Sequence, residues 1–125
     1  MVTPGATAEL VHTVGAADTA TAVGSGDLPV LGTPRLVAWF EAATCAAVDG
    51  TLGEGMTSVG IRVDVRHEAP SPVGAAVRVR ATLATVDGRR LTFEVRAEHV
   101  DGEVVGRGVV ERVVVDAERF MGRLG

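Results

Sequence analysis

The sequence predicts a single α+β domain, in which a five-stranded antiparallel sheet wraps around one long buried helix. Residues 33–49 lack glycine and carry only three charged side chains, so a helix here is apolar nearly all round and needs a sheet to cover it. Between residues 57 and 115, polar and apolar residues alternate, which is typical of strands with one buried face. Two Asp-Gly pairs, at 87–88 and 101–102, predict hairpin turns that make neighbouring strands antiparallel.

The predicted helix has clear start and stop signals. Thr33 can cap its first turn, Pro34 suits the first helical position, and Gly50 supplies a C-terminal stop. Cys45, within this segment, is interpreted as a small core residue. The glycine-rich residues 20–32 show no period and are expected to form a loop.

The strands are predicted from the same alternation. The expected ranges are residues 9–15, 57–68, 75–86, 90–100 and 103–115. In the second range, one apolar face is expected to hold Val59, Ile61, Val63, Val65 and His67. Gly106 and Gly108 indicate a bulge or a close backbone approach in the last strand. A short helix is expected at residues 117–124.

Composition and charge exclude several function classes. The 125 residues include 12 basic side chains, all arginine, and 16 acidic ones, with few aromatics, so nucleic-acid binding is not expected. A single cysteine excludes an internal disulfide and fits a reducing compartment. Neither a signal peptide nor a membrane span is recognisable, so we expect a cytoplasmic protein without a membrane partner. One domain over residues 1–125 is expected, with its core at about 8–120.

Glu41 is the first candidate for chemistry. It lies in the middle of the apolar helix, where an unpaired carboxylate costs free energy. Either it occupies a narrow exposed stripe or pairs with an arginine such as Arg62 or Arg66, or it is a functional group. No other charge lies between residues 36 and 48, so both interpretations stay open.

The histidines supply the second candidate. His67 points to the apolar face at the end of its strand, while His99 has the same orientation and His12 has no identifiable partner. A hydrogen-bonded core histidine is the alternative to a catalytic one. Three scattered histidines and Cys45 match no metal-ligand spacing, and no phosphate loop is present, so neither a metal nor a cofactor is predicted.

The chain resembles the hotdog-fold acyl-CoA thioesterases, and within them the fluoroacetyl-CoA thioesterase-like family. The resemblance covers about residues 28–120 and rests first on spacing: Glu41 follows Thr33 by eight residues, and His67 follows Glu41 by 26. The other matching positions are Gly32, Gly60, Pro72, Gly74, the 86–91 hairpin, Gly106, Gly108, Glu111, Arg112 and residues 118–120.

This resemblance implies a function and a site. Family members hydrolyse a short acyl thioester of coenzyme A with a Thr, Glu and His set, here Thr33, Glu41 and His67. Gly60 would lie near the thioester carbonyl, and Arg112 is a candidate for contacting coenzyme A. We expect Glu41 to act as base or nucleophile with the other two assisting, although a nucleophilic Thr33 stays open.

The resemblance also implies dimers whose sheets continue across the interface. The long strand 57–68, apolar on one face, independently indicates a homodimer or higher homo-oligomer. The sequence leaves open whether one subunit or two form the site. Members selective for fluoroacetyl-CoA carry lid phenylalanines before the catalytic Thr, and residues 24–31 hold no aromatic, so the acyl group is not predicted. A non-catalytic acyl-CoA-binding protein and a hotdog hydratase or dehydratase are the alternatives.

Overall fold

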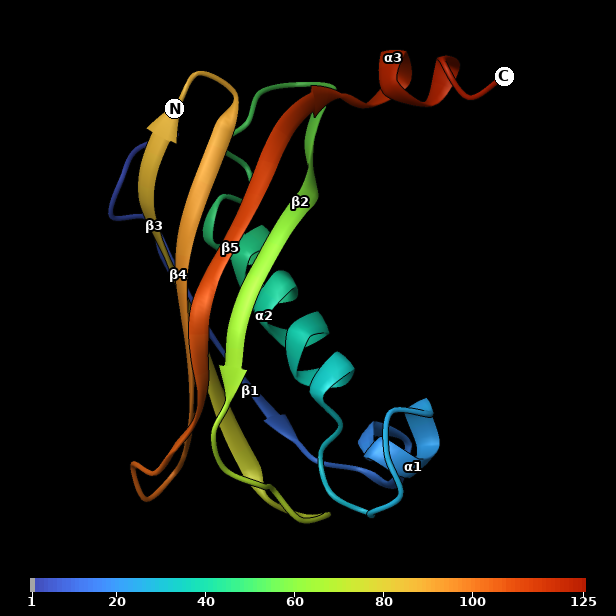
Figure 1. Ribbon diagram of the computed structural model, residues 1–125. Coiled ribbons are helices and arrows are strands. Elements are labelled where there is room, and N and C mark those ends of the chain that lie inside the picture. The colour runs from blue at the N-terminus through green and yellow to red at the C-terminus, as the bar shows by residue number, and fades with distance from the viewer. Residues whose placement is uncertain (1) are drawn as a thin grey trace.

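The computed structural model describes residues 2–125 and contains one antiparallel sheet and one long helix (Figure 1). In sheet order, the strands are β1 (Thr7–Thr13), β3 (Ala76–Asp87), β4 (Arg90–His99), β5 (Val104–Asp116) and β2 (Met56–His67). The helices are α1 (Ala20–Val23), α2 (Thr33–Ala47) and α3 (Ala117–Gly122), with a 3₁₀ turn at Ala16–Asp18. The predicted α+β class and the five strands are confirmed.

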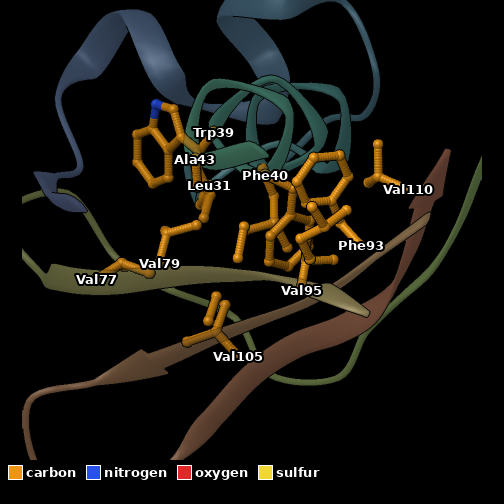
Figure 2. Close-up of a cluster of buried hydrophobic side chains, with 14 of the residues drawn as sticks. Leu31, Trp39, Phe40, Ala43, Val77, Val79, Phe93, Val95, Val105 and Val110 are labelled. Atoms are coloured by element: carbon orange, nitrogen blue, oxygen red, sulfur yellow. The ribbon is translucent and has the colours of Figure 1, made fainter. Parts of the chain in front are cut away.

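Helix α2 packs against one face of the sheet and forms the core with it. In Figure 2 the helix contributes Phe40, which lies close to Phe93 and valines of the strands, while Trp39 lies at the side of the helix. Phe40 and Phe93 are both fully buried. Truncating either to alanine is expected to cost about 3–5 kcal/mol of stability, because a cavity would remain. The apolar helix and the alternating strands are therefore explained by one shared core.

The hairpin turns form where the Asp-Gly pairs predict them. Gly88 and Gly102 have φ angles of 59° and 95°, in the left-handed region that glycine adopts without strain. Each predicted strand begins and ends within two residues of an observed one. At Gly106 an added Cβ would lie 2.7 Å from the Arg66 carbonyl oxygen, so the predicted close backbone approach is confirmed.

The loop predicted at residues 20–32 is wrong in part, because its first residues form helix α1. Thr19 caps this single turn: its hydroxyl accepts a hydrogen bond from the Ala22 N–H. Gly32 lies directly against the turn, since an added Cβ would stand 2.8 Å from Val23 Cγ2. The contact needs the absence of a side chain at Gly32, which explains a glycine immediately before Thr33.

The predicted apolar face of β2 is also corrected. The pairing of β2 with β5 shifts between Gly60 and Arg62, which is a β-bulge at Ile61. Gly60 faces α2, because its missing Cβ would point at the Glu41 carboxylate. Val59 therefore faces away from the helix instead of sharing a face with His67.

Helix α2 is not buried on most sides, contrary to expectation. The face turned away from the sheet is exposed, and it holds Pro34, Ala38, Ala42, Cys45 and Ala46. The interpretation of Cys45 as a core residue is wrong, since the sheet covers only the opposite face of the helix. Strand β2 lies at the edge of the sheet, where Ile61 and Val63 are exposed apolar side chains.

Candidate active site

Thr33 and His67 meet at the N-terminal end of α2. Gly32, not Thr33, is the N-cap residue, so the predicted capping role of Thr33 is wrong. Thr33 is the first helical residue, and its Oγ1 lies 2.8 Å from Nδ1 of His67 in a hydrogen bond. Figure 1 shows the end of β2, which carries His67, beside the start of α2.

The chain after His67 is held against β5. The N–H groups of Glu68 and Ala69 donate to the same carbonyl oxygen, that of Val105, at 2.7 and 3.2 Å. The strand ends at His67, and the chain bends at Ala69. This attachment keeps His67 pointing toward the helix, where Thr33 is within reach.

The environment of His67 favours the neutral ring. Burial lowers the pKa of His67 below its ordinary value of 6.5, because the charged form loses hydration. The backbone of Ala69 opposes this shift. Nε2 is buried, and no atom of residues 2–125 bonds to it. A neutral imidazole bonded to a hydroxyl has the geometry of a base beside a nucleophile.

A hollow of about 340 Å³ opens beside this pair. Its walls come from α1, the chain before α2 and the chain after β2: Ala20, Ser25, Gly26, Asp27, Leu28, Val30, Leu31, Thr33, His67, Glu68, Ala69 and Pro70. Six of these side chains are aliphatic or proline, and none is Phe, Tyr or Trp. Asp27 and Glu68 contribute the two carboxylates.

Glu41 lies elsewhere on α2, in contact with a buried arginine. Its Oε2 accepts a hydrogen bond of 3.3 Å from Nη1 of Arg112 on β5. Ser58 of β2 binds the other two nitrogens of the guanidinium: Nε donates to Oγ at 2.8 Å, and Nη2 donates to the carbonyl oxygen at 3.0 Å. Arg112 is 7% exposed and each of its three guanidinium nitrogens donates a hydrogen bond, whereas the Glu41 side chain is 37% exposed. The arginine partner of Glu41 is thus Arg112, not Arg62 or Arg66.

Gly60 completes this second group. A Cβ at Gly60 would lie 2.5 Å from Oε2 of Glu41 and 3.5 Å from Nη1 of Arg112. Any side chain here would displace the carboxylate. The glycine therefore provides the space into which Glu41 extends.

The predicted residues divide into two groups of neighbours, one of two residues and one of three. The structure brings Thr33 to His67, and it brings Glu41 to Gly60 and Arg112. Eight residues of helix separate Thr33 from Glu41, about 12 Å along the helix axis, so the two groups do not touch. Sequence reasoning missed Ser58, and its hydroxyl carries no spacing signal that could have identified it.

The remaining histidines lie outside both groups. His12 stacks on Trp39, with ring centroids 4.4 Å apart, and burial lowers the pKa of His12 despite nearby Asp18. His99 is hydrogen-bonded to Ser71 and Glu103. Within residues 2–125, no three metal-ligating side chains gather closely enough to bind a metal ion. Over the same residues, no helix has the length and hydropathy needed to cross a bilayer.

A family model supplies the classification. The model described as "FlK: Fluoroacetyl-CoA-specific thioesterase" matches residues 14–118, which include both groups of the site. The chain belongs to this family.

Individual relatives agree with this classification. A fluoroacetyl-CoA thioesterase of Streptantibioticus cattleyicolor is 37% identical over 91 residues, 73% of this chain and 65% of that protein. The chain thus matches less than two thirds of that relative's length. The crystal structure of the fluoroacetyl-CoA thioesterase FlK aligns with a TM-score of 0.92 and 28% identity, covering 99% of this chain and 96% of the other.

A second solved structure extends the likeness. A thioesterase superfamily member of Thermus thermophilus aligns with a TM-score of 0.91 and 26% identity, covering 99% of this chain and 91% of that one. These alignments run over nearly the whole chain, so the sheet around α2 is the hotdog fold.

Proposed function

We propose that the protein hydrolyses the thioester of a small acyl group carried on coenzyme A. The observation that carries the proposal is the Thr33–His67 hydrogen bond of 2.8 Å beside an open hollow. A hydroxyl bonded to a neutral imidazole is the arrangement that activates a nucleophile for acyl transfer. The family to which the chain belongs supports the same reaction class.

In the proposed mechanism, Thr33 attacks the thioester carbonyl carbon. Its hydroxyl proton passes to Nδ1 of His67 as the new C–O bond forms, and the C–S bond then breaks. Thiolate is a good leaving group and takes the proton as coenzyme A departs. Water next cleaves the acyl-threonine ester, which restores the hydroxyl and releases the free acid. The alternative, in which Glu41 activates water or attacks directly, predicts no acyl-threonine.

The side chains that line the hollow indicate which acyl groups it can hold. Its aliphatic walls, including Leu28, Val30 and Leu31, favour an uncharged alkyl group of a few carbons. The carboxylates of Asp27 and Glu68 disfavour acyl groups that end in a second carboxylate. The absence of Phe, Tyr and Trp from the walls of the hollow argues against selectivity for fluoroacetyl. A related structure, a variant of FlK, is described as a complex with fluoroacetate and CoA, which supports a coenzyme A thioester.

We further propose that two copies complete one site. Because Glu41 lies about 12 Å along the helix from Thr33, it does not reach the Thr33–His67 pair of its own chain. A second copy facing α2 would bring its own Glu41 toward that pair. There the carboxylate would orient or deprotonate the water that cleaves the acyl-enzyme.

Two exposed features support this dimer. The outer face of α2 presents small side chains such as Ala38 and Ala42, which permit close approach of another helix. Strand β2 is an unpaired edge with Ile61 49% exposed, so a second β2 can extend the sheet. The partners proposed are thus an acyl-CoA substrate and a second copy of this chain, in the cytoplasm.

A thiol-release assay tests the reaction. Acyl-CoAs of increasing chain length, with succinyl-CoA as the carboxylate-bearing comparison, should show release that is lost in both Thr33→Ala and His67→Ala. Release that persists in both variants would refute the Thr33–His67 mechanism. No release from any acyl-CoA, together with tight binding, would make the protein an acyl-CoA-binding module.

Mixing two inactive variants tests the shared site. If Glu41 acts across the dimer, unfolding and refolding Thr33→Ala together with Glu41→Gln should restore part of the activity. In a mixed dimer, one site then receives an intact Thr33–His67 pair from one chain and Glu41 from the other. A monomer by light scattering, or a mixture as inactive as its components, would contradict the shared site.

A further inference from the structure

A second polar network lies near the proposed active site. Ser71 Oγ is 2.7 Å from Nε2 of His99, and Nδ1 of His99 is 2.9 Å from Oε1 of Glu103. The order hydroxyl, imidazole, carboxylate has the form of a hydrolase triad. Ser71 is completely buried, however, so its hydroxyl cannot meet a substrate. We therefore consider what these hydrogen bonds do within the protein.

Ser71 connects this network to the chain that carries Thr33. Its carbonyl oxygen accepts a hydrogen bond of 2.8 Å from the N–H of Leu31, two residues before Thr33. The adjacent residues Val30 and Pro72 form a β-bridge. The segment with Ser71 is thus attached directly to the start of α2.

Ser71 also lies close to His67 in the sequence. Three residues lie between them, and the last of these is Pro70, which has no N–H to donate. The side-chain bond of Ser71 therefore adds to the backbone bonds that Glu68 and Ala69 donate to Val105. His99 and Glu103 lie at the β4–β5 turn, which Figure 1 shows at the same end of the molecule as α1.

The turn itself is built to hold the carboxylate in place. The N–H of His99 donates to the carbonyl oxygen of Glu103 at 2.9 Å, and the N–H of Glu103 donates to Oδ1 of Asp101, also at 2.9 Å. With Glu103 accepting from Nδ1–H, a neutral His99 offers Nε2 as an acceptor, and Ser71 donates to it. The Ser71 hydroxyl and both ring nitrogens of His99 thus have partners in this network.

We propose that Ser71, His99 and Glu103 are positioning residues that hold Thr33 and His67 in hydrogen-bond contact. They join the β4–β5 turn to the segment after His67, and through Leu31 to the start of α2. Loss of the network lets both segments shift, which lengthens the Thr33–His67 bond. The effect on turnover rests on the proposed function, whereas the effect on the bond does not.

Nuclear magnetic resonance of the imidazole nitrogens measures that bond without substrate. The chain has three histidines, so the ring signals of His67 are readily assigned. We expect Ser71→Ala to shift the Nδ1 signal of His67, although Ser71 does not touch that ring. Thr51→Ala is the matched control, because it removes a 2.7 Å hydroxyl bond to Val48 at the other end of α2. It should leave His67 unchanged.

Glu103 allows the same test without disturbing the interior. Its side chain is 59% exposed, so Glu103→Ala should fold even if Ser71→Ala does not. Glu103→Ala should shift the His67 signal, and Glu103→Gln, which keeps an acceptor oxygen, should restore it. A folded Glu103→Ala protein with unchanged His67 signals would overturn the proposal.

Kinetics test the catalytic consequence. Displacing reacting groups by a fraction of an ångström should lower kcat for thiol release by roughly tenfold to a hundredfold in Ser71→Ala, while KM changes less than about twofold. A shifted His67 signal with normal kcat would refute the catalytic part alone. If the unmodified protein releases no thiol, the proposed function fails and the resonance experiment still decides the positioning role.

Discussion

The two polar groups on α2 differ in how much of their hydrogen-bonding capacity is used. At the start of the helix, Thr33 and His67 share one hydrogen bond, and Nε2 of His67 has no partner among residues 2–125. In the middle of the helix, Arg112 uses all three nitrogens on Ser58 and Glu41. The first group keeps donors and acceptors available for a ligand, and the second has a defined orientation.

Position along the helix explains the difference. The middle of α2 lies over the sheet, where a buried guanidinium without partners would cost several kcal/mol. The start of α2 is covered by α1 and by the chain after β2, which leave a hollow. The polar side chains that remain available to a ligand thus lie where loops, and not strands, cover the helix. The following predictions test this contrast, in order of decreasing effect.

Thr33→Ala and His67→Ala should cause the largest loss of activity. Each removes one partner of the open pair, so kcat for thiol release should fall by about 10²–10⁴-fold. Thr33→Ser retains the hydroxyl and should keep most of the activity. Mass spectrometry of a quenched reaction should detect acyl-threonine in the unmodified protein; its absence under burst conditions would favour Glu41 as the group that acts on the carbonyl.

Arg112→Leu should instead affect stability most. It leaves the Glu41 carboxylate and Ser58 without their partner, so the free energy of unfolding should fall by about 3 kcal/mol in urea denaturation. Arg62→Leu is the matched control, because Arg62 forms ion pairs with Glu111 and Asp64 while 55% exposed. Its loss should cost less than about 1 kcal/mol. Equal losses in the two variants would contradict a special role for the buried pair.

Gly60→Ala should change the orientation of Glu41 with little change in the stability of the protein. The added Cβ displaces Glu41, a flexible side chain, so kcat should fall about tenfold while stability changes by less than about 1 kcal/mol. Gly122→Ala has no atom within 4 Å of its added Cβ and should change neither quantity. Normal kcat in Gly60→Ala would show that the position of Glu41 does not limit turnover.

The smallest predicted effect is a pH dependence of stability. The pKa values of His67 and His12 are lowered by burial from 6.5, so the unfolded chain binds more protons than the folded one just below that pH. Stability should therefore be complete above pH 6.5 and decrease as pH falls through the lowered pKa values. Urea denaturation at about pH 7.5 and about pH 5.5 measures the difference, and His67→Gln should reduce it.

Local sequence features determined most of the fold. The alternation of residues 57–115 and the Asp-Gly turns defined four strands, because a strand's faces and a tight turn depend on neighbouring residues. The lack of charge in residues 36–40 and 42–48 likewise identified the helix and isolated Glu41. These signals come from residues that are neighbours in the sequence, so they can be recognised without knowing which segments pack together.

Other features required the tertiary structure. The bulge at Ile61 reversed the face of Val59, since register depends on the pairing of β2 with β5. Cys45 is exposed because the sheet covers one face of α2, and no helical pattern shows which neighbours a face will meet. The pairing of Glu41 with Arg112 joins residues 71 positions apart. The sequence determined by itself which residue types form each element, whereas packing decided which polar groups found partners and which stayed available.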